Sequence, residues 1–166
     1  MESNSVPSGK YDVVFSNKTM AALLQTYASV FSAEQAQKGM SLLKGKEGER
    51  IAAPFITIVD DPRYEENYVM RTFDGEGVAA YAKNVVEDGV LVTLLHNLKT
   101  AAKAGVKSTG NASKSSYDAV VGVSPFTFYI KAEGGSETLG AERRKGLEDM
   151  LASAGEGLYI TELMGL

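Results

Sequence analysis

The chain has 166 residues, a formal net charge of −4, 44% hydrophobic residues, no cysteine and one histidine, His96. This composition excludes an intrinsically disordered chain, and the lack of cysteine excludes a disulfide framework, a thiol nucleophile and a thiolate metal site. A zinc site made by this chain alone is also disfavoured, because zinc takes three or four Cys, His or carboxylate ligands. A single domain of this length buries about 69% of its unfolded surface, so it can form a core without metals.

The sequence shows no membrane or secretion signal. It has no run of 18 apolar residues, and residues 1–10 lack the apolar stretch of a signal peptide. We therefore expect a cytoplasmic protein with no membrane partner, in which residues 1–10 form a disordered leader and residues 11–166 fold. The negative charge disfavours nucleic acid as a partner, although residues 89–117 hold four lysines and no acid.

The first elements are a strand over residues 11–15 and two helices. Ser16 or Asn17 can cap a helix whose apolar side chains share one face as far as Phe31. The spacing Ser32-x-x-Gln35 is that of a capping box and predicts a second, short helix. The glycine-punctuated residues 44–50 predict a loop.

A series of apolar runs then predicts strands over residues 51–59, 64–73, 78–86 and 90–95. Asp88-Gly89 separates the last two runs and predicts a hairpin, because a type I′ turn requires a positive φ at both central residues. Further predictions are a helix over 98–104 ended by Gly105, a loop over 108–116, and strands over 117–123 and 126–132.

A helix over residues 141–154 and a strand over 157–164 complete the chain. Leu147, Met150 and Leu151 are expected to face inward from that helix. The order of elements is neither alternating βα nor all-β. It predicts an α+β fold, with a mainly antiparallel sheet, the Asp-Gly hairpin and three to four helices.

Two acidic motifs are candidates for chemistry. Asp60-Asp61 and Asp74-Gly75-Glu76 could bind a hard cation or supply a general acid and base, but Asp and Gly are also the commonest turn residues after strands. We favour the turn interpretation, which assigns no catalytic residue and no metal ligand to this chain.

A basic stretch offers a second kind of site. Lys99, Lys103 and Lys107 recur every four residues and could meet phosphates, although a solvated helix face is favoured. Thr109-Gly110-Asn111 could form an anion-binding nest of backbone N–H groups, or a tight structural turn. His96 follows an apolar run, and a capping or surface histidine is favoured there.

Five motifs in chain order carry a resemblance to a known family. They are Ile58-Val59-Asp60-Asp61-Pro62, Phe73-Asp74-Gly75-Glu76-Gly77, Asp88-Gly89-Val90-Leu91, Thr109-Gly110-Asn111-Ala112 and, at the end, Gly157-Leu158-Tyr159-Ile160-Thr161-Glu162-Leu163-Met164-Gly165. Over residues 11–166 this series resembles the PmbA (TldE) branch of the TldD/PmbA family, whose members are labelled modulators of DNA gyrase. Pro62, Ala112 and the Glu162-Leu163-Met164-Gly165 ending resemble that branch in particular.

The resemblance implies a fragment of a longer protein, covering the middle and the start of its C-terminal domain. It further implies a heterodimer with a TldD-like metalloprotease subunit, which acts on unfolded peptides and holds the zinc, so that no cofactor is expected in this chain. DNA gyrase would be an indirect partner. Asp60, Asp61, Asp74, Glu76, Asp88, Gly89, Thr109, Gly110, Asn111 and Glu162 would be turn or interface residues.

Three functions therefore stay open. The first is a non-catalytic scaffold and dimerisation domain whose strand edges hold peptide. The second is a fragment of a self-sufficient metallopeptidase. The third is a module that binds anions, nucleic acid or gyrase through Lys99, Lys103 and Lys107.

Overall fold

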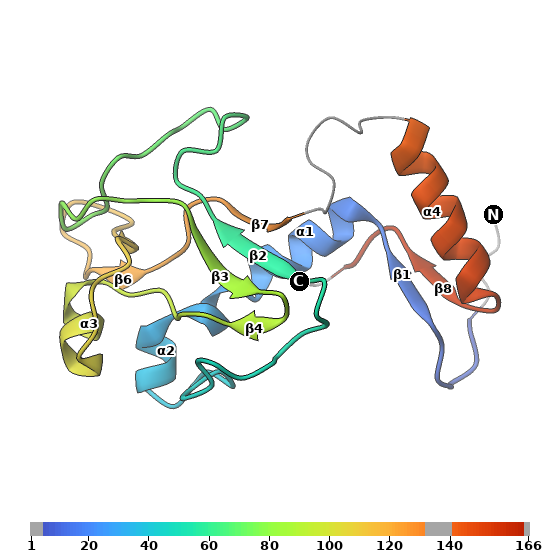
Figure 1. Ribbon diagram of the computed structural model, residues 1–166, viewed down its shortest axis with the longest axis horizontal. Coiled ribbons are helices and arrows are strands. Elements are labelled where there is room, and N and C mark those ends of the chain that lie inside the picture. Colours follow the sequence, from blue (N-terminus) through green and yellow to red (C-terminus); the bar gives the residue numbers. More distant parts are fainter. Residues whose placement is uncertain (1–4, 132–140, 165–166) are drawn as a thin grey trace. The chain divides into compact units, whose positions relative to one another are not determined.

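The computed structural model describes residues 5–131 and 141–164 of the chain (Figure 1). The chain divides into two compact units, Met1–Leu23 with Gly134–Leu166, and Leu24–Glu133. None of the helices in the described ranges is long and apolar enough to cross a membrane. Part of the predicted leader, residues 1–4, lies outside the described residues.

The smaller unit joins the two ends of the sequence. Strand β1 (Val13–Phe15) pairs in parallel with β8 (Leu158–Ile160), and helix α4 (Ala141–Ala154) packs against β1. The predicted terminal strands and helix are thus confirmed in position. Met150 was expected to face inward, but it is 52% exposed, so the inward prediction is wrong for this residue.

The first helices follow from local capping and packing. The Ser16 hydroxyl accepts a hydrogen bond from the Thr19 N–H over 3.1 Å, and α1 (Asn17–Thr26) begins beside it. The helix does not reach Phe31 as predicted, since a 3-10 turn, η1 (Ala28–Phe31), replaces its last part.

Helix α2 (Ala33–Gln37) begins where the capping-box spacing predicted. Ser32 holds the N-cap position, but its side chain makes no cap hydrogen bond, so the predicted box is absent. The helix start is held instead by the backbone, because the Ala33 N–H donates to the Leu95 carbonyl over 2.9 Å.

A four-stranded antiparallel sheet organises the larger unit, in the order β4 (Val90–Leu91), β3 (Lys83–Glu87), β2 (Thr57–Asp60) and β7 (Phe128–Lys131). Asp88 has a φ of 48° and Gly89 a φ of 80°, so the predicted β3–β4 hairpin is confirmed. The α+β class with a mainly antiparallel sheet is confirmed as well.

Several predicted strands are shorter than their apolar runs, and one is absent. Residues 51–56 and 64–72 are loops, and the 117–123 run forms only β6 (Gly122–Val123), which pairs with β5 (Ala112–Ser113) inside the predicted 108–116 loop. The 64–73 run fails as a strand because its amides serve loop closure, as where the Arg71 N–H donates to the Pro62 carbonyl over 2.9 Å.

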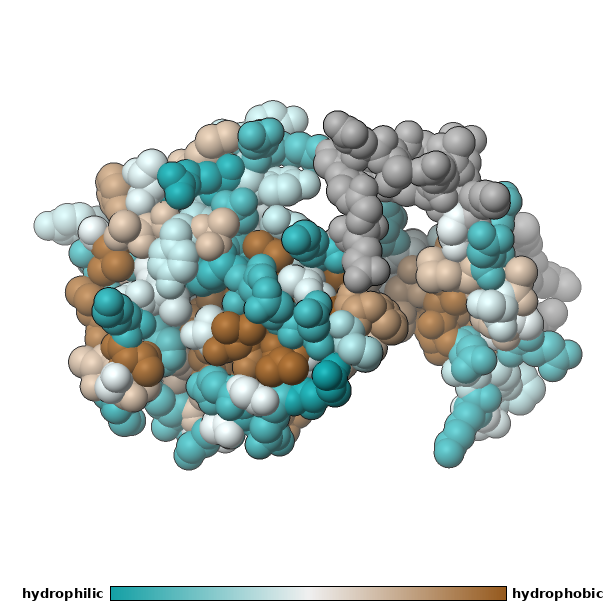
Figure 2. All heavy atoms as spheres, viewed as in Figure 1, coloured by the Kyte–Doolittle hydropathy of each residue, from teal (hydrophilic) through white to brown (hydrophobic). Residues whose placement is uncertain are grey.

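Helix α3 (Leu98–Ala104) has the predicted bounds. Asn97 and Thr100 form a reciprocal capping box, and Gly105 ends the helix with a φ of 71°. Its buried face joins the core of the larger unit, in which Val85, Val86, Leu91 and Leu95 are fully buried. The visible face of the molecule carries apolar residues intermixed with hydrophilic ones (Figure 2).

Candidate functional site

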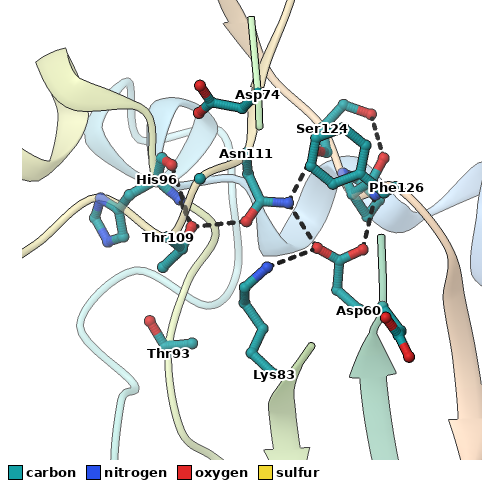
Figure 3. A network of polar contacts seen from close by, with 12 residues as sticks. Asp60, Asp74, Lys83, Thr93, His96, Thr109, Asn111, Ser124 and Phe126 are labelled. Atoms are coloured by element: carbon teal, nitrogen blue, oxygen red, sulfur yellow. Dashed lines mark hydrogen bonds and ion pairs between the residues drawn. The ribbon is translucent and has the colours of Figure 1, made fainter. Parts of the chain in front are cut away.

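The Asp60 carboxylate, at the end of β2, is one of the most buried polar groups in the larger unit. It is 0% exposed and accepts three hydrogen bonds (Figure 3). Its Oδ2 lies 3.1 Å from Nζ of Lys83 and 2.6 Å from Nδ2 of Asn111, and its Oδ1 lies 2.7 Å from the Phe126 N–H. One carboxylate thus joins β3, the loop around Asn111 and the segment before β7.

Lys83 supplies the positive charge that makes this burial possible. The antiparallel register places Lys83 directly opposite Asp60, with side chains only 5% and 0% exposed. The ammonium also lies 4.7 Å from the centre of the Tyr81 ring, at cation–π distance. A buried ion pair of this kind requires both partners, because either charge left alone would be uncompensated.

Asn111 extends the network through the Thr109-Gly110-Asn111 turn. Its Oδ1 lies 2.8 Å from the Thr109 hydroxyl, and its Nδ2 also reaches the Ser124 carbonyl at 3.2 Å. The turn's amides are engaged as well: the Asn111 N–H donates to the His96 carbonyl, and the Gly110 N–H to the Ser108 hydroxyl. This geometry favours the structural turn over the anion nest.

The second acidic motif closes a loop of its own. Asp74 Oδ1 accepts from the N–H groups of Glu76 and Val78, and its Oδ2 accepts from the Ala112 N–H, each over 2.9 Å. Glu76 Oε2 accepts from the Leu98 N–H over 2.8 Å. The carboxylates therefore bind this protein's own amides, and the ranges that the structure describes contain no group of three His, Cys, Asp or Glu residues suited to a metal ion.

His96 lies beside this network and is buried, which makes the surface alternative wrong. The Thr109 hydroxyl holds its backbone, accepting from the His96 N–H over 2.7 Å and lying 3.1 Å from its carbonyl. His96 is 5% exposed, and its Nδ1 has no hydrogen-bond partner among the described residues. Burial lowers the pKa of His96, although the Thr100 backbone and the Glu47 carboxylate oppose the shift.

The other predicted residues lie apart from the network. Asp61 accepts from the Arg63 N–H over 2.9 Å, Asp88 and Gly89 form the hairpin turn, and Glu162 is exposed in the smaller unit. Lys99 and Lys103 lie on α3, whereas Lys107 follows its end.

Sequence reasoning missed Lys83, which is the partner on which the buried carboxylate depends. A signal was present, because Lys83 is a lone cation within the apolar 78–86 run. The Ser124 carbonyl and the Phe126 amide also belong to the network, but as backbone groups they leave no trace in side-chain identity.

Comparison with known proteins identifies the family and several similar chains. The family described as the PmbA/TldA metallopeptidase C-terminal domain matches residues 8–166. The metalloprotease PmbA of Escherichia coli O157:H7 is 28% identical over 156 residues, which is 94% of this chain and 30% of that protein.

Two solved structures are also similar. A Thermotoga maritima protein described as a modulator of a DNA gyrase has a TM-score of 0.79 and 37% identity, covering 98% of this chain and 34% of its own. TldE from Thermococcus kodakarensis has a TM-score of 0.74 and 26% identity, covering 93% and 33%. The resemblance to the family, and to chains named PmbA and TldE within it, is confirmed. The chain spans about a third of the length of these relatives.

Proposed function

This chain belongs to the PmbA/TldA metallopeptidase C-terminal domain family, and we propose that it is a non-catalytic scaffold and dimerisation domain of a PmbA-like subunit. The subunit would work in a zinc-dependent protease complex of the TldD/PmbA type that acts on unfolded peptides in the cytoplasm. The observation that carries the proposal is that the side chains of the motif residues are already engaged in hydrogen bonds within the protein. Asp60, Asp74, Thr109 and Asn111 are all buried and bonded to this protein's own groups, as structural residues are.

The zinc that the family implies does not fit the donors described here. Both oxygens of Asp60 and both oxygens of Asp74 already accept hydrogen bonds, and Asp60 is paired with Lys83. The His96 imidazole has no carboxylate or second imidazole placed with it as a metal-binding group among the described residues. We therefore assign the zinc, and the catalytic step that needs it, to a TldD-like partner.

Strand β7 supports a role in holding extended peptide. In the antiparallel register with β2, the Asp61 N–H donates to the Thr127 carbonyl, so alternate residues of β7 face β2. The N–H and C=O groups of Phe128 and Ile130 therefore point to the other edge, and within the described residues β7 pairs with β2 alone. Such an edge can bind an added strand through its main chain.

The subunit proposal is tested on the full-length protein, mixed with the TldD-like protein of the same organism. We expect the two to co-elute in a one-to-one complex, with zinc only on the partner.

The peptide-binding edge of β7 is tested with two variants of Ile130. Ile130→Pro removes the outward N–H, and Ile130→Ala removes much of the same side chain but keeps that donor. Peptide binding should weaken in the proline variant relative to the alanine variant, and equal binding would argue against the edge.

A self-sufficient metallopeptidase is the second candidate, favoured by the name metalloprotease that the E. coli relative carries. In that case the residues outside this chain would supply the zinc site. The same experiment separates the two functions. Zinc on the full-length protein alone, together with peptide hydrolysis in the absence of a partner, would establish the second and reject the first.

A further inference from the structure

A small pocket of about 130 Å³ opens between α2, α3 and residues 120–121 of the larger unit. Lys38 lines it from the end of α2, and Lys99 and Lys103 line it from α3. Because Lys99 and Lys103 are four residues apart, they lie on one face of the helix, where like charges repel each other. Lys107 is not part of the lining, since Gly105 ends α3 before it.

Two of these three positive charges are not neutralised. Lys38 Nζ lies 2.7 Å from Glu34 Oε1, an ion pair at the edge of the pocket. Lys99 and Lys103 make no ion pair with any residue in the described ranges. No acid occurs anywhere between Gly89 and Tyr117, so the nearby sequence does not offset them either.

The remaining lining shows which anion fits. Val120 and Val121 form an apolar wall, and Val120 is 91% exposed. The volume lies below the roughly 300–1,000 Å³ of ordinary ligand pockets, so it suits one anionic group rather than a whole small molecule. A nucleic acid is disfavoured, because it needs a track of cations along many phosphates, whereas only two unpaired lysines line this pocket.

We propose that this pocket docks an acidic segment of a partner protein, with a carboxylate between Lys99 and Lys103 and an apolar neighbour against Val120. The pocket involves neither the zinc nor the β7 edge. A negative result for the pocket would therefore leave the subunit proposal unchanged, and the reverse also holds.

The test uses the full-length protein and a short fluorescein-labelled peptide of alternating Glu and Val, with a Gln–Val peptide of equal length as the uncharged comparison. Fluorescence anisotropy should show binding of the Glu–Val peptide that weakens as salt is raised. The double variant Lys99→Gln/Lys103→Gln should bind it roughly 2- to 30-fold more weakly, as expected for two exposed charge pairs.

The matched control is Lys44→Gln/Lys107→Gln, which removes the same charge at exposed positions outside the pocket. It should bind the peptide like the unaltered protein, and both double variants should keep its melting temperature. Equal weakening in the two variants would overturn the proposal by showing a general charge effect. Tighter binding of inorganic phosphate or of a single-stranded oligonucleotide than of the peptide would also overturn it, in favour of a phosphate site.

Discussion

Asn111 Nδ2 lies 2.6 Å from Asp60 Oδ2, although 51 positions separate the two residues in the chain. Each belongs to a different family motif, and Lys83, from neither motif, binds the same carboxylate oxygen. These two motif turns thus meet in one buried polar network rather than forming separate surface loops. Such a network rigidifies a fold when every member is satisfied and destabilises it when one is removed.

Asn111→Ala tests the amide in this network. The variant removes the donor to Asp60 and leaves the Thr109 hydroxyl without the Asn111 acceptor, so the free energy of unfolding should fall by about 1–3 kcal/mol. Urea denaturation measures the loss. Asn84→Ala is the control, because its side-chain hydrogen bond to Glu87 is exposed and its removal should cost within about 0.5 kcal/mol. Similar losses in the two variants would contradict a central role for Asn111.

Lys83→Met tests the buried ion pair. Without the ammonium, the Asp60 carboxylate stays buried with no compensating cation, and we expect a loss of about 3–5 kcal/mol in the free energy of unfolding. Lys46→Met removes one partner of the exposed pair with Glu49 and should cost no more than about 1 kcal/mol.

The double variant Lys83→Met/Asp60→Asn separates charge from packing. It should recover part of the stability lost in Lys83→Met, because no uncompensated charge remains, although one N–H donor loses its acceptor. If the double variant is no more stable than Lys83→Met alone, the loss comes from packing of the lysine stem and not from the ion pair.

Gly110→Ala tests the close approach of the turn to its neighbour. Gly110 has a φ of 69°, and an added Cβ would lie 2.5 Å from the Ala79 carbonyl oxygen. Gly39 has a similar φ of 75° with nothing within 4 Å, so Gly39→Ala reports the cost of the left-handed conformation alone, about 1–2 kcal/mol. Gly110→Ala should lose a further 1–3 kcal/mol or so from the steric overlap. Equal thermal shifts in the two variants would show that the loop relaxes freely.

The features that sequence predicted well are those controlled by neighbouring residues. Asp88-Gly89 allows positive φ at both turn positions, and Gly105 ends α3 for the same reason. The α+β class also follows, since it depends only on the order of the apolar runs. Predictions failed where the conformation depends on contacts beyond the local pattern. The pattern of residues 64–73 suggests a strand, but their amides donate hydrogen bonds that close a loop.

The candidate site was predictable in its members but not in its arrangement. Asp60, Asp74, Thr109 and Asn111 were all singled out as turn residues. Sequence periodicity, however, does not predict the contact between Asn111 and Asp60, because the two residues are 51 positions apart and the Asn111 backbone is held by His96 and Ser124. The burial of His96 was missed for the same reason, since the residues around it, such as Thr109 on its backbone, come from other parts of the sequence.

The last prediction concerns His96 and the pH dependence of stability, because its lowered pKa couples protonation to unfolding. Burial lowers the pKa of the folded imidazole, while in the unfolded chain it titrates near its ordinary value of about 6.5. The unfolded state therefore binds more protons as the pH falls below about 6.5, and stability present above that pH should be lost as the pH falls toward the folded pKa. His96→Gln should show a smaller loss of unfolding free energy between about pH 6.5 and 5 than the unaltered protein.

NMR titration of the imidazole measures the pKa of His96 directly. The assignment is unambiguous because the sequence contains one histidine. The folded midpoint should lie below about 6.5. The comparison with His96→Gln also cancels every contribution to the pH dependence that the two proteins share. A midpoint at or above the ordinary value, with equal pH slopes for the two proteins, would mean that the imidazole finds a proton acceptor or solvent in solution, and that its burial does not control the acid stability of this fold.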